Sequence, residues 1–343
     1  MNAMFCRALG FSALLLLAAC GSDGGNAGGD FASEPKLETD PALLDAALDC
    51  TPFEHADKPP VLLVHGTGTY GQEQYNWSYK PLLMARGFDV CTVSYPDRGL
   101  GDQQISAEYV VHALRRIHAE SGRKVAMVGH SQGATMPRWA LKWWPSARAA
   151  VQDFVLIAGP NHGTVIAATG GNPVSGLLTG LLGLPAGTFQ FSPESNFVRV
   201  LNTGDETPGD IDYTNLYTVF DELVQPALPV PTAALEFGLD NPKVANILLQ
   251  DICPGRLVDH LTIGLTDRLA FELTLDAISQ PGPAHVERAG GSGLCLLLPL
   301  LPDQAIAPNA LTQILSVVPM SIANGAPSLH LVSEEPPLKA YAQ

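Results

Sequence analysis

The sequence predicts an α/β fold in which helices flank a mostly parallel central sheet. Short apolar runs of strand length alternate with segments of helical periodicity, the order that parallel β–α–β units produce. A Gly-x-Ser-x-Gly motif at 129–133 lies where one such run meets the next helix. Apolar residues make up 46% of the chain and charged residues only 15%, so the chain can bury a large core.

The first elements are a strand, a loop and a helix. Val61–Val64 is a continuous apolar run introduced by two prolines, which predicts a buried strand. The loop that follows, His65-Gly66-Thr67-Gly68-Thr69, has no lysine after it, so a phosphate-binding loop is disfavoured. A short helix is expected over 79–86, stopped by Gly87, and a second strand over 90–94.

The middle of the chain continues the alternation. Ile105, Tyr109, Ala113 and Ile117 recur at helical spacing, which predicts an amphipathic helix over 105–120. A strand at 124–128 and a helix at 134–144 flank the glycine-serine motif, and Pro137 should weaken or kink that helix. Further strands are expected at 154–158 and 215–219.

The glycine-serine motif is typical of a nucleophile elbow. In such a turn a serine sits at a strained strand-to-helix corner, and its neighbours lack side chains so that the turn can pack tightly. This makes Ser131 the candidate nucleophile; the alternative is a purely structural turn.

A serine nucleophile needs a base, and the base needs an orienting acid. In this type of fold the order along the chain is serine, acid, histidine. Asp221 follows the strand at 215–219 and His260 comes later, so these two are the candidates, with Glu222 as an alternative acid. The other histidines and carboxylates fit less well, because of their order or because they lie in Gly/Pro loops: His162, His285, His330, Asp205, Asp210, Asp212 and Asp259.

The developing oxyanion requires preorganised donors. The backbone N–H of Gln132, directly after the nucleophile, is one candidate. Thr67, in the loop after the first strand, is the other, through its N–H and its hydroxyl.

The N-terminus predicts export. Residues 1–19 combine a basic start with a short apolar stretch, as in a signal peptide, and Leu17-Ala18-Ala19-Cys20 is similar to a bacterial lipobox. We therefore expect lipid on Cys20, a flexible linker over 20–45 and a catalytic domain over 46–343, on the bacterial cell envelope and anchored in its membrane. The alternative is an ordinary cleaved signal and a secreted protein.

Composition and cysteine count exclude several classes. A net charge of −15 argues against nucleic acid and against electrostatic docking on anionic lipid. Of the six cysteines, Cys6 is expected to leave with the signal peptide and Cys20 to carry lipid. The other four allow three disulfide pairings, of which the local one, Cys50–Cys91 with Cys253–Cys295, is favoured. No Cys/His cluster suggests zinc, and neither metal nor cofactor is expected.

Together these segments resemble a known family. Leu62–Thr69, the elbow, the block Asn215–Pro226 and Val258-Asp259-His260 are similar to the lipase family typified by Candida antarctica lipase B, over roughly residues 48–300. The resemblance implies an α/β-hydrolase fold, with Asp221 as acid, His260 as base, Thr67 and Gln132 as oxyanion donors, and bridges where the two cysteine pairs fall.

Three departures limit what the resemblance implies. His130 stands where that enzyme has a tryptophan lining its alcohol pocket, and Asn161 replaces an acidic residue of the pocket wall. The C-terminal bridge of that enzyme has no cysteines here.

The predicted function is hydrolysis of lipophilic carboxylic esters through an acyl-enzyme. The segment 165–184, apolar without a clean period, is either a flap over the site or a core helix. Alternatives are a polyester depolymerase, an acyltransferase, or a lipid-binding lipoprotein without activity.

Overall fold

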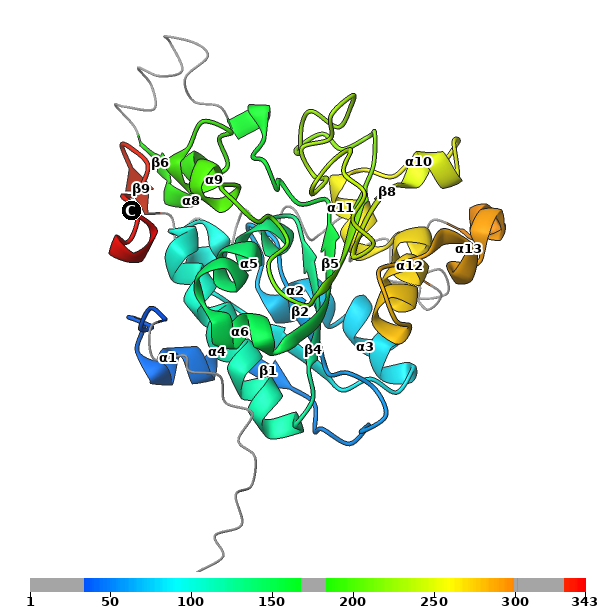
Figure 1. Cartoon of the computed structure of the whole chain (residues 1–343), viewed down its shortest axis with the longest axis horizontal. Helices are drawn as coiled ribbons and strands as arrows, with labels where there is room; N and C mark the ends of the chain where they lie inside the picture. Colours follow the sequence, from blue (N-terminus) through cyan, green and yellow to red (C-terminus); the bar gives the residue numbers. More distant parts are fainter. Residues whose placement is uncertain (1–33, 168–182, 299–300, 302–329) are drawn as a thin grey trace, which may run out of the picture.

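A computed structural model describes residues 34–167, 183–298, 301 and 330–343. Its centre is a seven-stranded sheet, parallel except for the first strand, which pairs antiparallel at one edge (Figure 1). In spatial order the strands are β1 (Leu48–Cys50), β3 (Val90–Val93), β2 (Val61–Val64), β4 (Val125–His130), β5 (Val151–Ile157), β7 (Asp212–Tyr217) and β8 (Val244–Leu248). The predicted mostly parallel sheet is therefore confirmed.

Two hydrophobic cores cover the two faces of the sheet. Alternate residues of each strand pack in one core or the other, because successive side chains of a strand point to opposite faces. Leu62 and Val64 pack in one cluster, whereas Val61 and Leu63 pack in the other. This explains why the central strands read as unbroken apolar runs: both faces of the sheet are covered.

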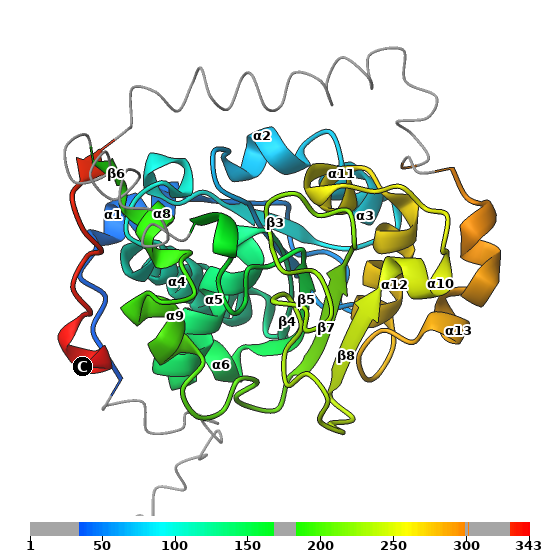
Figure 2. The same cartoon turned by 90° about the horizontal axis from the view of Figure 1, so that it is seen from above.

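Helices form the two outer layers (Figure 2). The first core contains residues of α1 (Pro41–Ala46), α4 (Gln103–Ser121), α5 (Gln132–Trp143), α6 (Pro145–Ala149) and α9 (Asn196–Leu201). The second contains residues of α2 (Gly71–Tyr75), α3 (Tyr79–Ala85), α10 (Leu249–Ile252), α11 (His260–Leu265) and α12 (Arg268–Ser279). Besides several short 3₁₀ segments, the structure contains α8 (Ala186–Gln190), α13 (Val286–Ala289) and a small antiparallel sheet of β6 (Leu184–Pro185) and β9 (Leu331–Val332). In the described part of the chain, no helix is both long and apolar enough to span a membrane.

The folded part begins earlier than predicted. Residues 34–45 were expected to belong to a flexible linker, but Glu34 accepts hydrogen bonds from Ser146, and the indole of Trp144 donates to the carbonyl of Pro35. Asp40 then caps α1. The composition of this stretch resembles a linker, yet these contacts hold it against α6 and the end of α5.

Two disulfides connect the pairs that the local pairing predicts. Cys50–Cys91 joins the antiparallel edge strand to its neighbour, and Cys253–Cys295 ties the segment after α10 to a 3₁₀ turn at Gly291–Leu296. Both bridges are consistent with an oxidising compartment.

Candidate active site

The turn between β4 and α5 holds Ser131 in a conformation that few residues adopt. Its φ of 57° and ψ of −124° lie outside the regions favoured by side-chain-bearing residues. The flanking glycines are required by contact: a Cβ on Gly129 would come within 1.8 Å of the Gly133 carbonyl oxygen, and one on Gly133 within 2.2 Å of the Val64 carbonyl oxygen. The predicted elbow is therefore present, and it presents Ser131 at the carboxyl edge of the sheet. Pro137 is accommodated inside α5.

Three side chains form a hydrogen-bonded series at this edge. The Ser131 Oγ lies 2.9 Å from His260 Nε2, and His260 Nδ1 lies 2.9 Å from the nearer oxygen of Asp221. His260 and Asp221 are both almost completely buried. Because the carboxylate accepts from Nδ1, Nε2 is left as the nitrogen that faces the serine hydroxyl, as proton transfer from serine requires.

The loops that carry Asp221 and His260 are fixed to each other. The Asp221 carboxylate accepts from the amides of Leu223 (2.9 Å) and Val224 (2.7 Å), which sets its orientation. The hydroxyl of Thr218 donates to the carbonyl of Val258 at 2.8 Å, two residues before the histidine. These bonds join the end of β7 to the start of α11, so the acid and the base keep one relative position.

Glu222, the alternative acid, has a different partner. Its carboxylate accepts from the backbone N–H of His260 at 3.1 Å, not from the imidazole ring. The geometry therefore favours Asp221 over Glu222 as the group that orients the ring.

Thr67 and Gln132 come from different segments of the chain, and their side chains contact each other. Thr67 belongs to the loop after β2, and its hydroxyl donates to the side-chain oxygen of Gln132 at 3.2 Å. Within the described residues, neither backbone N–H has a hydrogen-bond acceptor in the protein. Both donors are thus available to a ligand oxygen near Ser131.

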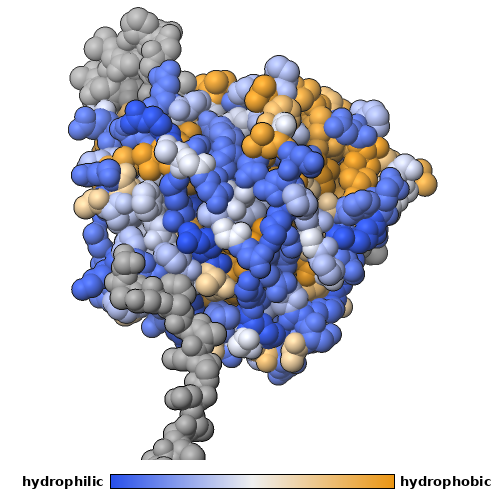
Figure 3. All heavy atoms as spheres, viewed as in Figure 1, coloured by the Kyte–Doolittle hydropathy of each residue, from blue (hydrophilic) through white to orange (hydrophobic). Residues whose placement is uncertain are grey.

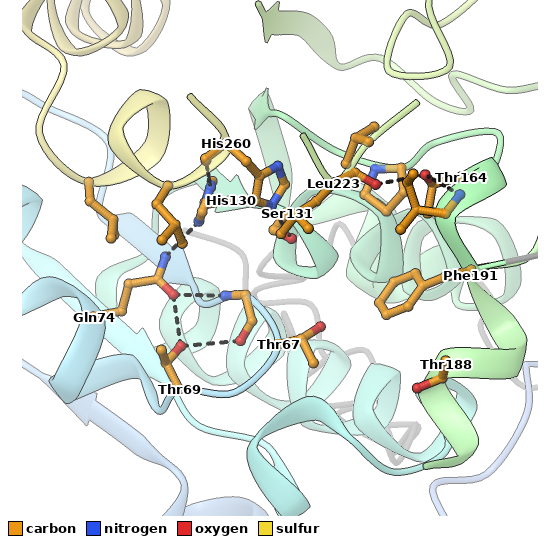
Figure 4. A pocket seen from close by; sticks show the side chains of 17 residues that line it. Thr67, Thr69, Gln74, His130, Ser131, Thr164, Thr188, Phe191, Leu223 and His260 are labelled. Atoms are coloured by element: carbon orange, nitrogen blue, oxygen red, sulfur yellow. Dashed lines mark hydrogen bonds between the residues drawn. The ribbon is translucent and has the colours of Figure 1, made fainter. Parts of the chain in front are cut away.

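A cavity of about 330 Å³ opens over the serine. Figure 4 shows Ser131, His260 and Thr67 around it, with Leu223 beside the serine and Phe191 and Thr188 at the right of the view. The lining is mostly apolar, and its polar members include the Ser131 hydroxyl and the His260 ring: Gly66, Thr67, Thr69, Gln74, His130, Ser131, Pro160, Thr164, Ile166, Ala167, Thr188, Phe191, Leu223, Val224, His260, Leu261 and Leu265. This combination suits a substrate with an apolar body and one polar reacting group.

The two tentative pocket residues have different positions. His130 lines the cavity. Asn161 is completely buried and is absent from the lining, because its amide is engaged by Thr135, Asn215 and the carbonyl of Ala233; its neighbour Pro160 lines the cavity instead. The expectation that Asn161 forms part of the wall is therefore corrected. Of the flap candidate 165–184, residues 168–182 lie outside the described part, while Ile166 and Ala167 line the cavity.

Sequence reasoning missed a buried polar series beside the cavity. His130 Nε2 lies 2.8 Å from the carbonyl oxygen of His260, and its Nδ1 lies 3.3 Å from the Gln74 side-chain nitrogen. The Gln74 oxygen accepts from the Gly66 amide and the Thr69 hydroxyl. Burial lowers the pKa of His130 to about 3, so the ring is neutral, with its proton on Nε2 facing the carbonyl. Gln74 carries no motif that could have identified this role.

Apolar side chains gather on the surface near the cavity. Figure 3 shows this area at the upper right, where Figure 1 draws the segment after β7 and helices α10 and α11. Leu228, Val230 and Leu257 are each more than half exposed, as is Ile166 at the cavity itself. An apolar surface next to a reactive centre suits lipophilic substrates.

The other histidines are placed elsewhere. His162 pairs with Glu206, and His285 caps α13. Among the described residues no group of three or more histidines, cysteines or carboxylates could hold a metal ion.

Comparison with known proteins identifies the family of the chain. A model of the alpha/beta hydrolase family matches residues 61–307. The chain belongs to the alpha/beta hydrolase family. This hydrolase is 30% identical to lipase B of Pseudozyma antarctica over 289 residues, which cover 81% of the chain and 80% of that protein.

Two further relatives are lipases. A triacylglycerol lipase of Pseudomonas fragi is 31% identical over 115 residues, 32% of this chain and 36% of that one. The crystal structure of Aspergillus fumigatus lipase B superposes with a TM-score of 0.78 at 28% identity, covering 90% of this chain and 73% of that one. The resemblance to the lipase B family is confirmed, and the protein is a hydrolase of the lipase and esterase type.

Proposed function

We propose that this hydrolase cleaves lipophilic carboxylic esters through a Ser131–His260–Asp221 triad. The observation that carries the proposal is the unbroken series from the Ser131 hydroxyl through the buried imidazole to Asp221, at the floor of a mostly apolar cavity. A serine hydroxyl is unreactive unless a base removes its proton, and this series supplies that base.

The reaction follows from the positions of the atoms. Ser131 Oγ attacks the ester carbonyl while His260 Nε2 takes its proton, and Asp221 stabilises the imidazolium that forms. The amides of Thr67 and Gln132 donate to the carbonyl oxygen as it becomes negative, each worth about 3 kcal/mol in comparable enzymes. His260 then gives the proton to the leaving alcohol. Water, activated by the same histidine, releases the acid and restores the serine.

The test is hydrolysis of p-nitrophenyl esters, from acetate to palmitate, by the chain and by its Ser131→Ala variant. We expect turnover to rise with acyl length beyond acetate, because the cavity is apolar, and the variant to lose at least about 10⁴-fold in kcat. Equal turnover by the folded variant would remove Ser131 from the mechanism. A wild-type chain that is folded but inactive on every ester, and unreactive with a fluorophosphonate, would favour a binding protein.

Lipid attachment at Cys20 remains a prediction of the sequence, because residue 20 lies outside the described part. With it we propose export to the bacterial envelope, which the two disulfides support.

A further inference from the structure

The short 3₁₀ segment Pro96–Gly99 has an unusual backbone. Asp97, Arg98 and Gly99 all have positive φ, at 54°, 54° and 73°. Residues with a Cβ avoid this left-handed region because the Cβ crowds the following carbonyl oxygen. Two such residues in succession persist only where the surrounding structure holds them, and such strain is concentrated at functional sites.

The groups that hold this segment belong to the loop of Thr67. The Gly68 amide donates to the Arg98 carbonyl at 2.7 Å, and Arg98 Nε donates back to the Gly68 carbonyl at 2.9 Å. Arg98 thus forms hydrogen bonds with both the N–H and the carbonyl of Gly68. The left-handed backbone of Arg98 accompanies this arrangement, in which its carbonyl and its side chain both reach Gly68.

The Arg98 side chain is buried, yet its charge is compensated. It is 3% exposed, forms an ion pair with Glu73, and lies 4.4 Å from the ring centroid of Tyr70. Glu73 and Tyr70 both follow Gly68 closely in the chain. Arg98 therefore binds the 68–73 segment at three points, through a carbonyl, a ring and a carboxylate.

The next residue contacts the other oxyanion candidate. The Gly99 carbonyl accepts from the Gln132 side-chain nitrogen at 2.9 Å, and the Gln132 side-chain oxygen accepts from the Thr67 hydroxyl at 3.2 Å. A Cβ on Gly99 would come within 2.1 Å of that oxygen. Residues 98 and 99 together contact both segments that carry the available amides.

We propose that Arg98 is a positioning residue that fixes Gly68, and through it the backbone of Thr67, for oxyanion stabilisation. The inference rests on the proposed function. An amide donor lowers a barrier only if it is already aimed at the place where charge develops, since turning it during the reaction costs the energy it would supply. Holding Gly68 at both its N–H and its carbonyl restricts the backbone on the C-terminal side of Thr67, so the Thr67 amide keeps one direction.

The inference makes a specific kinetic prediction for Arg98→Met, which keeps the length of the side chain but removes its charge and donors. We expect kcat on p-nitrophenyl butyrate to fall about ten-fold, less than the 10²–10³ lost when an oxyanion donor is removed entirely. KM should change less than about two-fold, because the donors act mainly in the transition state.

A trifluoromethyl ketone provides the second readout. It accepts the Ser131 oxygen at its carbonyl carbon, the serine proton passes to His260, and the carbonyl oxygen becomes an oxyanion. Its inhibition constant should rise in Arg98→Met by the same factor as kcat/KM falls. A residue that only supports the fold would change the melting temperature, but the change in the inhibition constant would not match the change in kcat/KM.

Two variants serve as controls. Arg123 likewise donates to backbone carbonyls and pairs with a buried aspartate, but at the opposite edge of the sheet, so Arg123→Met should leave kcat and the inhibition constant unchanged. Arg98→Lys, which keeps the charge, should recover part of the lost kcat. If Arg98→Met does not fold, Arg98→Lys and Glu73→Gln test the role of Arg98 in its place. A lower kcat at constant KM in these variants would support that role.

The outcomes separate the two proposals. A folded Arg98→Met variant with wild-type kcat and inhibition constant overturns the role of Arg98 while the triad stands. Hydrolysis that does not depend on Ser131 in the wild-type background overturns the proposed function itself, before any Arg98 variant is compared.

Discussion

Two aspartate–histidine pairs lie at opposite edges of the same sheet. At the carboxyl edge Asp221 bonds His260 Nδ1 at 2.9 Å, and at the amino edge, just before β3, Asp89 bonds His55 Nδ1 at 2.8 Å. Both aspartates are buried, and each also accepts from two backbone amides. In their shortest distances and local bonding the two pairs are nearly the same.

They differ in what lies around them. Asp89 also pairs with Arg123, and the side chain of His55 is 45% exposed. Among the described residues His260 is the only basic side chain within reach of the Asp221 carboxylate, and the ring of His260 continues to a serine beside a cavity. The Asp89 charge is therefore already compensated, whereas that of Asp221 is available to an imidazolium. The comparison teaches that, in the proposed mechanism, an aspartate–histidine pair becomes a reaction centre through its third partner, the serine.

The largest difference between the two aspartate–histidine pairs should appear in kcat. We expect Asp221→Asn to lower kcat by about 10⁴-fold, because an amide favours the wrong tautomer of the ring. Asp89→Asn should leave kcat within about two-fold, since it lies at the other edge of the sheet. The comparison fails if both variants lose activity to a similar extent while remaining folded, as measured with p-nitrophenyl butyrate.

A second difference concerns stability. Removing the Asp89 charge leaves Arg123 without its partner in a largely buried place, which should cost about 3 kcal/mol at pH 7. Burial opposes ionisation of Asp89, but the hydrogen bonds from Arg123, His55 and the backbone outweigh it, so its pKa is lowered. A lowered carboxyl pKa stabilises the folded state above the ordinary value of about 4, and this contribution is lost as the pH falls through the folded value.

Melting curves at two pH values test whether the stabilisation by Asp89 is lost on acidification. The difference in melting temperature between the wild-type chain and Asp89→Asn should be large at pH 7 and should shrink well below pH 4. A difference that grows on acidification would contradict it.

The smallest effect is expected for Glu222→Gln. Within the described part of the chain its carboxylate bonds only the backbone N–H of His260, and glutamine keeps an oxygen acceptor there. We expect a loss of kcat below about ten-fold, corresponding to a bond of roughly 1 kcal/mol. A loss as large as that of Asp221→Asn would move the acid by one residue.

The sheet could be predicted largely from sequence because its strands are buried on both faces and read as apolar runs. β1 and β8 could not: β1 is only three residues long, and β8 begins with half-buried residues at the sheet edge. The packing of residues 34–45 also escaped prediction, since it depends on partners such as Trp144 and Ser146, which are distant in sequence.

The candidate site, like the sheet, contains residues that could be predicted from sequence and residues that could not. Ser131, Asp221 and His260 carry local signatures and follow a fixed order along the chain, and the structure brings them together. Arg98 and Gln74 carry none, because their roles come from contacts between loops. Asn161 was misplaced because a position in sequence does not specify whether a side chain faces a cavity or the interior.

The packed stretch from Glu34 through α1 determines on which side of the folded domain the chain leaves toward its N-terminus. Figures 1 and 2 place α1 across the molecule from α11, whose first residue is His260. With lipid on Cys20, as proposed, the chain would be held from the side of the folded domain that lies across from the exposed apolar residues near α11, such as Leu257. The apolar surface beside the cavity would then stay open to esters in the surrounding medium.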